Sequence, residues 1–558
     1  MTTSLAAREI EPPPAQSAIT VEHLWKAFHD DRQQATVIAI SDVTITVPRG
    51  QFVCICGPSG CGKSTLVRIL AGLERETLGN IGIERQDSVA RPPAMVFQEA
   101  SLFPWLTIED NIMVPLRLQG ASTTEQKERA RELLALMRLE EFARAFPHQL
   151  SGGMKQRASV ARALIDRDSN ILLMDEPFGA LDEQTRMELQ QELLRIWERT
   201  GKTVVFITHS VEEALTLGDR IIVMSARPGE IIADITVPFE RPRDVLELRR
   251  HPEFGHMTFE IWSLLARFKK EAVSAQPDAT SKEQRSAAPK AASGATLEEL
   301  ERLARPSRSR KMISLLGKFS PLTVLLLWEI VVATGVADDR FFPAPSSILS
   351  IFWSELIHGP LLADAYATLE RVLVGFAIGG IPAIALGLML GVWPIARELI
   401  APIFSALYPI PKIATFPLLL MIFGLGEAPK YAIIAIVVFF LVFFNTMSGA
   451  RYAPKIYFDV GHNLGMSRFN LFRFIALPAA LPSIFTGLKL AIGTAFIVIS
   501  AVEFVGAKTG LGYAIWSSWQ IFAVEKMYVN IIAISLSGYL SIIALDSIER
   551  IITPWSRQ

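Results

Sequence analysis

The chain has 558 residues and a formal net charge of −1, with 50% hydrophobic residues and a mean hydropathy of +0.32. This length suits two or three domains, and the near-neutral charge argues against a nucleic-acid-binding protein. Most apolar runs lie after residue 312, so we expect a soluble first half and a second half that is embedded in a lipid bilayer.

The first residues lack the pattern of a secretory signal peptide. Residues 1–17 contain a run of prolines from Pro12 to Pro14, and no basic stretch precedes an apolar run. We therefore expect a flexible leader followed by a cytoplasmic domain. The chain has three cysteines, Cys54, Cys56 and Cys61. They lie too close together in sequence for a disulfide framework across a fold, which predicts reduced thiols.

Residues 18–240 alternate short apolar runs with amphipathic helical patterns. Continuous apolar runs bounded by loops predict strands that are buried on both faces of a mostly parallel sheet. The predicted strands are Phe52–Cys56, Ala94–Gln98, Ile171–Met174, Val204–Thr208 and Ile221–Met224. Residues 241–265 continue as a short helical tail, so the first domain is expected to cover residues 18–265.

A linker and a membrane domain are expected next. Residues 266–312 are small, polar and charged, a composition that cannot bury a core. In residues 313–558, six apolar stretches approach the roughly 20 residues that a helix needs to cross a bilayer. They cover about 317–337, 368–393, 398–424, 431–449, 481–505 and 528–548. Pro409, Pro411 and Pro417 interrupt the third stretch, and we expect the translocation path there because irregular backbone at membrane depth lines cavities.

Charged residues beside these stretches indicate an orientation. If the first domain is cytoplasmic, four spans return the chain to the cytoplasm near residue 450. The next loop carries basic residues, namely Arg451, Lys455, Arg468 and Arg473. Residues 338–365, on the opposite side, are mainly acidic, in agreement with the positive-inside rule. This predicts a multi-pass membrane protein, with the first domain on the cytoplasmic side.

Three ionisable residues lie within the apolar stretches, Glu329, Lys489 and Glu503. Each is costly when it faces lipid, so we expect each to face the bundle interior or a membrane edge. Glu503 is a candidate for the translocation path, and an interhelical hydrogen bond is the alternative for all three residues.

A phosphate-binding pattern follows the first predicted buried strand. The matching residues are Gly57, Pro58, Ser59, Gly60, Cys61, Gly62, Lys63, Ser64 and Thr65. Between a strand and a helix, such a loop turns backbone N–H groups toward an anion at the positive end of the helix. We expect Lys63 to bring its charge to the β- and γ-phosphates of ATP, and Ser64 to offer a hydroxyl to Mg²⁺.

Ile171–Glu176 forms a second nucleotide motif, in which four apolar residues precede two acids. Asp175, at the end of the predicted strand, is expected to hold Mg²⁺. Glu176 is expected to polarise a water molecule for attack on the γ-phosphate. The alternative for Glu176 is a solvated surface acid.

With a third motif, Leu150–Met154, the chain resembles the ATP-binding cassette superfamily. The resemblance implies that Ser151, Gly152 and Gly153 form the signature loop, which contacts ATP held by a second cassette. Met154 stands where many family members have Gln. Since one chain carries one phosphate loop and one signature, two composite sites need two cassettes, which predicts a homodimer of the whole chain.

The same resemblance implies further roles in the nucleotide site. Gln98 matches the Q-loop residue, which contacts Mg²⁺ and senses the membrane domain. Asp182 matches the D-loop, and His209 matches the switch histidine, which contacts the γ-phosphate. Phe28 is a candidate to stack on adenine, although a core position is the alternative for a single aromatic residue.

Residues 455–478 resemble the cytoplasmic coupling loop of importer permeases. Asp459 and Gly465 start the pattern, and nine residues separate Gly465 from Ile475-Ala-Leu-Pro478. The common form begins with Glu-Ala-Ala, where this chain has Asp459-Val-Gly461. We expect Phe103 and Trp105 to form an apolar socket on the first domain for residues 459–468. The alternative is a basic amphipathic loop without a special role.

Over about residues 18–245 and 315–550 the chain resembles the nitrate, sulfonate, taurine and bicarbonate importers. The matching segments are Phe97–Trp105, Asp175–Asp182, Tyr408–Lys412 and Asn445-Thr446. The resemblance implies a type I importer architecture, an α/β P-loop ATP-binding cassette followed by an all-α six-helix permease domain. It also implies an external substrate-binding protein and a small anionic cargo.

Two other functions stay open at this point. An exporter or lipid flippase usually places its membrane domain first and lacks the pattern from Asp459 to Pro478. A membrane-anchored regulatory ATPase would hydrolyse ATP at a rate that no binding protein changes.

Overall fold

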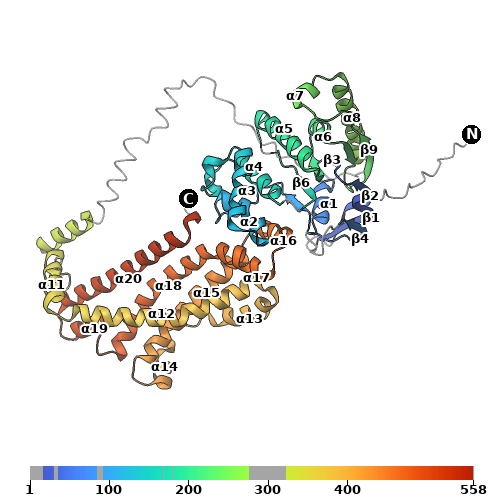
Figure 1. Cartoon of the computed structure of the whole chain (residues 1–558). Helices are drawn as coiled ribbons and strands as arrows, with labels where there is room; N and C mark the ends of the chain where they lie inside the picture. The colour runs from blue at the N-terminus through green and yellow to red at the C-terminus, as the bar shows by residue number, and fades with distance from the viewer. Residues whose placement is uncertain are drawn as a thin grey trace, which may run out of the picture. The chain divides into compact units, whose positions relative to one another are not determined.

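The computed structural model describes residues 17–30, 35–84, 92–166, 169–179, 181–274 and 322–556 (Figure 1). The predicted leader, except Ser17, and the predicted linker beyond Ser274 therefore lie outside the described residues. The described residues divide into two compact units. The first unit contains the chain through Ser274, the segment Ala453–Pro478 and the chain end from Trp555; the second contains the rest of the chain after Ser274.

A six-stranded sheet forms the centre of the first unit, in the order β5-β6-β7-β3-β8-β9. The strands are β3 (Phe52–Cys56), β5 (Ala94–Val96), β6 (Ile171–Asp175), β7 (Thr203–Thr208), β8 (Arg220–Met224) and β9 (Ile231–Thr236). All neighbours are parallel except β8 and β9. All residues of β3, β6 and β7 are buried, as expected for continuous apolar strands. The five predicted strands are confirmed with small changes at their ends.

The first unit also contains a three-stranded antiparallel sheet, in the strand order β2-β1-β4. Its strands are β1 (Ser17–Asp30), β2 (Ala35–Pro48) and β4 (Leu78–Ile83). These strands were not predicted individually from the sequence. Register shifts interrupt the pairing of β1 with β2, so no clean period-two alternation of apolar residues runs along them.

The first unit also contains ten α-helices among its described residues, and those from α2 to α8 share one apolar core with the six-stranded sheet. The ten helices are α1 (Lys63–Leu70), α2 (Ile108–Leu118), α3 (Thr123–Leu136), α4 (Gly152–Leu164), α5 (Glu183–Thr200), α6 (Val211–Leu217), α7 (Val245–Leu248), α8 (Pro252–Ser274), α16 (Lys455–Asn463) and α17 (Arg468–Leu471). α8 extends past the predicted end of the helical tail at residue 265. Phe254, Met257 and Ile261 explain why it packs here, since their spacing buries one face of the helix.

The second unit is helical. Its labelled α-helices are α11 (Pro345–His358), α12 (Leu361–Val392), α13 (Pro394–Leu407), α14 (Phe416–Phe423), α15 (Ala428–Arg451), α18 (Leu477–Gly506), α19 (Leu511–Gln520) and α20 (Val524–Ile552). Among the described residues, four helices are long and apolar enough to cross a membrane. They are Leu361–Val392, Ala428–Arg451, Arg468–Gly506 and Val524–Ile552, which correspond to the second, fourth, fifth and sixth predicted spans.

The first and third predicted spans look different in the structure. Leu322–Ala333 is a shorter apolar helix, and the start of the first predicted span lies outside the described residues. The predicted interruption of the third span, 398–424, is confirmed, because α13 ends at Leu407 and α14 begins at Phe416. Pro409 and Pro411 lie in this break, where a proline has no N–H to continue a helix.

A stripe of small residues joins α12 to α15. Its members recur every four residues along α12 and are all buried: Gly375, Gly379, Ala383, Gly387 and Gly391. A Cβ atom on Gly379 would lie 2.2 Å from the carbonyl oxygen of Ala435, so only glycine permits this approach of the two backbones. Small residues at such spacing are a common way to pack helices in a membrane.

A buried ion pair ties α12 to α18. Arg371 Nη1 donates to Glu503 Oε1 over 2.7 Å, and the side chains are 4% and 0% exposed. Arg371 also pairs with Glu427, just before α15. Glu503 is therefore an interhelical partner rather than a residue facing an open path. Hydrogen bonds also engage the other two ionisable residues, since Glu329 accepts from Ser346 and Lys489 contacts Asp546 and Glu549.

Candidate nucleotide site

The phosphate loop links β3 to α1, as its sequence predicts. Gly62, the residue before α1, has φ = 99°, a backbone conformation that favours glycine. Lys63 is only 5% exposed, and its Nζ donates to the carbonyl oxygens of Gly57 and Pro58 at 2.7 and 2.9 Å. Among the described residues, no carboxylate forms an ion pair with this ammonium group. A buried cation held by neutral carbonyl groups is suited to receive an anion.

Ser64 and Asp175 form the next part of the site. Ser64 Oγ donates to Asp175 Oδ1 over 3.0 Å, so the phosphate loop meets the end of β6. Asp175 is 4% exposed, and burial raises its pKa above the ordinary value, while the hydrogen bond from Ser64 acts in the opposite direction. A hydroxyl and a carboxylate side by side offer oxygen ligands of the kind that Mg²⁺ prefers.

These residues fit a nucleotide-bound Mg²⁺ rather than a metal caged by protein alone. Within the described ranges, no group of three or more His, Cys, Asp or Glu residues is placed to hold a metal ion. Mg²⁺ commonly binds one or two carboxylates and takes its other ligands from substrate phosphates and water. The pair of Ser64 and Asp175 is consistent with that donor set.

Two of the predicted residues converge on Glu176. Gln98 Nε2 donates to Glu176 Oε2 over 3.1 Å, and His209 Nδ1 lies 3.4 Å from the same oxygen. Glu176 has φ = 46°, which is uncommon for a residue other than glycine, and its backbone N–H donates to Ile207 on β7. Strand ends of β5, β6 and β7 thus bring together three polar side chains that the sequence spreads over more than a hundred residues.

Glu213 on α6 is a supporting residue that was not predicted from the sequence. Its Oε2 accepts from the hydroxyl of Thr208 over 2.5 Å, and Thr208 Oγ1 accepts from the backbone of Ser210 on the other side of His209. Glu213 is 8% exposed, and burial raises its pKa. An acid four residues after a histidine is not a distinctive signal, so only the fold shows this contact.

The signature and D-loop residues occupy helix starts. Ser151 Oγ accepts from the backbone N–H of Met154 at the start of α4, and Asp182 accepts from Thr185 at the start of α5. That hydrogen bond lowers the pKa of Asp182. Within the described residues, no hydrogen bond joins Ser151, Gly152 or Gly153 to the phosphate loop. The signature loop therefore does not complete the site of its own chain through such a bond.

Phe28 lies on β1 and is 39% exposed, with Lys26 Nζ 4.7 Å from the centre of its ring. An exposed ring face is compatible with stacking on a base. The alternative of a core position does not fit this exposure.

The segment Ala453–Pro478 packs in the same compact unit as the sheets. Phe103 and Trp105 are buried and stacked, with ring centroids 5.6 Å apart. Tyr457 on α16 meets Trp105 edge-on at 5.4 Å and lies 6.1 Å from Phe103. Gly465, with φ = 70°, forms the turn after α16. The aromatic pair thus receives a side chain of the predicted coupling loop, although the sequence analysis did not name Tyr457.

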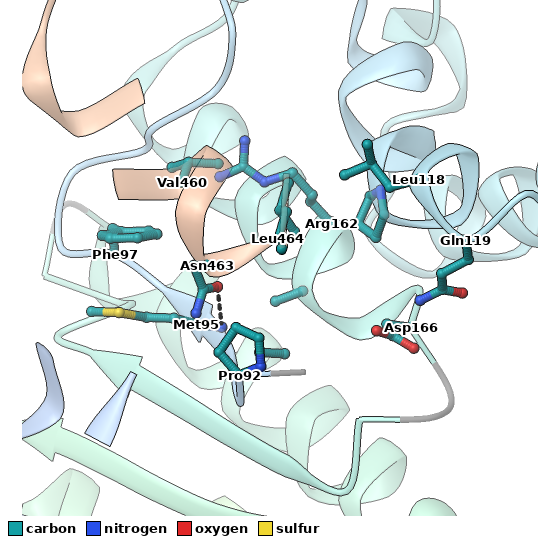
Figure 2. A pocket seen from close by; sticks show the side chains of 14 residues that line it. Pro92, Met95, Phe97, Leu118, Gln119, Arg162, Asp166, Val460, Asn463 and Leu464 are labelled. Carbon is teal, nitrogen blue, oxygen red and sulfur yellow. Dashed lines mark hydrogen bonds between the residues drawn. The ribbon is translucent and has the colours of Figure 1, made fainter. Parts of the chain in front are cut away.

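Polar contacts also fasten α16. Arg68 on α1 donates to Asp459 over 2.7 Å, and the side chain of Asn463 bonds to the backbone of Pro93 and Met95. Asn463 lines a cavity of about 250 Å³. Figure 2 shows Arg162 and Phe97 among its other lining residues. Arg68 and Asn463 were not predicted, because each pairs with a residue that is distant in sequence.

Comparison with known proteins agrees with this geometry. A family model described as ABC transporter matches residues 40–179, and one described as binding-protein-dependent transport system inner membrane component matches residues 383–558. The taurine import ATP-binding protein TauB of Rhizobium johnstonii is 43% identical over 254 residues, which are 44% of this chain and 96% of that protein. The chain belongs to the ABC transporter family.

Two further relatives of this ABC transporter are import proteins. The aliphatic sulfonates import ATP-binding protein SsuB of Bacillus cereus is 42% identical over 230 residues, 40% of this chain and 89% of the relative. The nitrate import ATP-binding protein NrtD of Synechocystis is 43% identical over 241 residues, 42% of this chain and 90% of the relative. The ABC transporter is a membrane protein that joins an ATP-hydrolysing cassette and an importer-type permease domain in one chain, so that hydrolysis is coupled to transport.

Proposed function

We propose that this ABC transporter imports a small anion across a bacterial inner membrane and receives it from an external substrate-binding protein. Nitrate, sulfonates, taurine and bicarbonate are the candidate cargoes, and the named relatives support the first three. The observation that carries the proposal is the seating of α16, a segment between two membrane helices, against Trp105 and Arg68 of the cassette. The proposed division of the chain is a cassette at 18–265, a linker at 266–312 and a permease domain at 313–558.

In the proposed site, Lys63 binds the β- and γ-phosphates of ATP, and residues 57–65 surround them with their backbone N–H groups, except Pro58, which has none. Ser64, Asp175 and the side-chain oxygen of Gln98 would hold Mg²⁺, which supplies positive charge to the phosphates when bound. The burial of Lys63, whose Nζ donates to the neutral carbonyl groups of Gly57 and Pro58, supports this assignment.

Glu176 is the proposed general base. Its carboxylate accepts a proton from the attacking water, while Gln98 and His209 keep its oxygen in place. His209 is also the proposed contact of the γ-phosphate, and Phe28 the proposed contact of adenine. This role of Glu176 explains why an acid with an unusual backbone conformation stands directly after Asp175.

Two chains are proposed to form the working unit. Ser151, Gly152 and Gly153 of one chain would bind the γ-phosphate of ATP held by the second chain, next to Asp182. An exposed Ser151 that caps α4 supports this arrangement, because the helix start offers N–H groups to an anion. ATP would then close two cassettes together, and hydrolysis would separate them.

Closure is proposed to reach the permease domain through the segment 455–478. Tyr457 sits against Phe103 and Trp105, so a rotation of this part of the cassette would carry α16 with it. The membrane helices that flank α16 would then open the translocation path to the outside of the membrane, where it accepts the anion.

The test uses the full chain in lipid vesicles, with candidate binding proteins loaded with taurine, an alkanesulfonate, nitrate or bicarbonate. We expect one loaded binding protein to raise the rate of ATP hydrolysis and to drive uptake of its ligand, whereas the same protein without ligand does less. ATP hydrolysis that is indifferent to every loaded binding protein would instead favour a regulatory ATPase.

A further inference from the structure

The six-stranded sheet has an open edge at β5, which pairs with β6 on one side only. On its other side, Asn463 Oδ1 accepts from the backbone N–H of Met95 over 3.2 Å (Figure 2). Asn463 Nδ2 donates to the carbonyl oxygen of Pro93 over 2.8 Å. One amide therefore makes the two hydrogen bonds that a neighbouring strand would make. Asn463 is 6% exposed, so solvent does not replace these bonds easily.

The chemistry of an amide is required at this position. Asparagine carries a donor and an acceptor on one short, rigid group, which matches the N–H and C=O groups of a strand edge. Aspartate has the same shape but offers no donor when it is ionised, and it would place a negative charge against the carbonyl oxygen of Pro93.

The strand that Asn463 holds leads directly to the nucleotide site. Val96 ends β5, and Gln98, two residues later, donates to Glu176. Between them, the carbonyl oxygen of Phe97 accepts from Gln156 on α4, the helix that begins at the signature loop. A shift of β5 along or away from the sheet therefore changes the position of Gln98 relative to the proposed general base.

A second polar contact fastens the same turn of α16 to a different element. Asp459, four residues before Asn463 and on the same face of the helix, accepts from Arg68 on α1. Ser64, four residues before Arg68 on α1, donates to Asp175. One turn of α16 thus contacts both α1, the helix that carries Ser64, and β5, the strand that leads to Gln98.

Packing near Asn463 is incomplete. The cavity of about 250 Å³ is lined by Met95 and Phe97 of the cassette and by Leu464 and Gly465 after the helix. Over the part of the chain that the structure describes, Asp459 and Asn463 are the residues of α16 whose side chains hydrogen-bond to the cassette. These two side chains fasten the end of α16 beside the cavity, in addition to the packing of Tyr457 against Phe103 and Trp105.

We propose that Asn463 is a positioning residue for ATP hydrolysis. Its amide closes the open edge of β5 and, together with the contact between Asp459 and Arg68, sets the spacing between α1 and the strand that presents Gln98 to Glu176. The inference rests on the proposed function, in which Glu176 is the base, and adds to it a residue of the permease half that sets the hydrolysis rate.

The test compares Asn463→Ala and Asn463→Asp with the unaltered full chain in lipid vesicles. The readouts are kcat and KM for ATP, the ATP bound per chain, and hydrogen exchange at the backbone amide of Met95. In both variants, kcat should fall about three- to tenfold, which is the effect expected for a lost hydrogen bond. The KM for ATP and the amount of ATP bound per chain should stay unchanged. Exchange at Met95 should become faster. His462→Ala is the matched control, since His462 is exposed and bonds within its own helix.

A double-variant cycle with Asp459→Ala separates positioning from simple attachment. If the two side chains act as one clamp, the double variant should be no slower than the slower single variant. A double variant whose fold-loss in kcat is the product of the two single losses would show that the two side chains act independently, which would contradict a joint action. Faster exchange at Met95 with an unchanged kcat would overturn the positioning role while the proposed function stands. Absence of ATP hydrolysis by the unaltered chain would instead count against the proposed function.

Discussion

Gln98 donates a hydrogen bond of 3.1 Å to Glu176, although 78 positions separate the two residues in sequence. The bond joins Gln98, two residues after the end of β5, to Glu176, the residue that follows β6. The hydrogen bond links the segment after β5, the strand that Asn463 of α16 contacts, to the acid that is proposed to activate water. The position of one carboxylate is therefore tied to the packing of α16.

Replacement of Glu176 by Gln should abolish turnover but preserve ATP binding. The amide keeps the size of the side chain and cannot take a proton from water, so kcat should fall about 100-fold or more. Binding of ATP, measured by equilibrium dialysis, should stay within about twofold of the unaltered chain because Lys63 and Ser64 are intact. Glu198→Gln, at an exposed position on α5, is the control and should leave both quantities unchanged. Full turnover by Glu176→Gln would show that another group activates water.

The buried cysteines should resist alkylation in the folded protein. Burial raises the pKa of Cys56 to about 12 and raises the pKa of Cys54 as well. The reactive thiolate is therefore scarce in the folded state at pH 8, and it becomes available only as pH rises toward the raised pKa. In the unfolded chain the pKa returns to about 8.5, so both residues should react at pH 8. Mass spectrometry after iodoacetamide treatment, with and without denaturant, checks this; rapid labelling of folded protein at pH 8 contradicts it.

Gly379→Ala should destabilise the second unit. A Cβ atom would lie 2.2 Å from the carbonyl oxygen of Ala435, so α12 and α15 would have to separate. Gly493→Ala is a matched control, because its Cβ would meet only Ile542 at 4.0 Å. Alanine also favours the helical state over glycine by about 1 kcal/mol, so the control should be neutral or stabilising. Thermal denaturation in lipid measures both, and equal melting temperatures for the two variants would argue against the close contact.

Arg371→Met should cost about 3–5 kcal/mol of stability, because it leaves the buried carboxylate of Glu503 without its partner. Adding Glu503→Gln should restore part of the loss, since the second change removes the uncompensated charge. The exposed pair of Arg340 and Asp338 provides the comparison, and Arg340→Met should not change the melting temperature measurably. A double variant less stable than Arg371→Met would contradict the pairing.

The parallel strands and the phosphate-binding residues could be predicted because their signals are local. Apolar runs such as Phe52–Cys56 are buried on both faces, and the residues from Gly57 to Ser64 adopt their turn within one short segment. The antiparallel strand β1 was not predicted, since its stability depends on pairing with β2 and β4 through irregular registers.

Contacts between distant residues account for most of what the sequence could not show. The glycines of α12 are explained by the close approach of α15, which the sequence does not show. The ion-pair partner of Glu503, Arg371, is 132 positions away. The break in the third span between Leu407 and Phe416 could be predicted, because the prolines that interrupt the helix are a local signal. Tyr457 and Asn463 are ordinary helix residues until β5 and Trp105 are placed beside them.

Cross-linking of the coupling segment to the cassette tests the central claim most directly. Cysteines are placed at Trp105 and Tyr457, whose ring centroids are 5.4 Å apart, in the full chain embedded in lipid. A short bifunctional thiol reagent should join them, with a yield that changes when ATP is added, while a cysteine at exposed His462 in place of Tyr457 should join poorly. No cross-link between positions 105 and 457 in any nucleotide state would contradict the account that the cassette moves the membrane helices through α16.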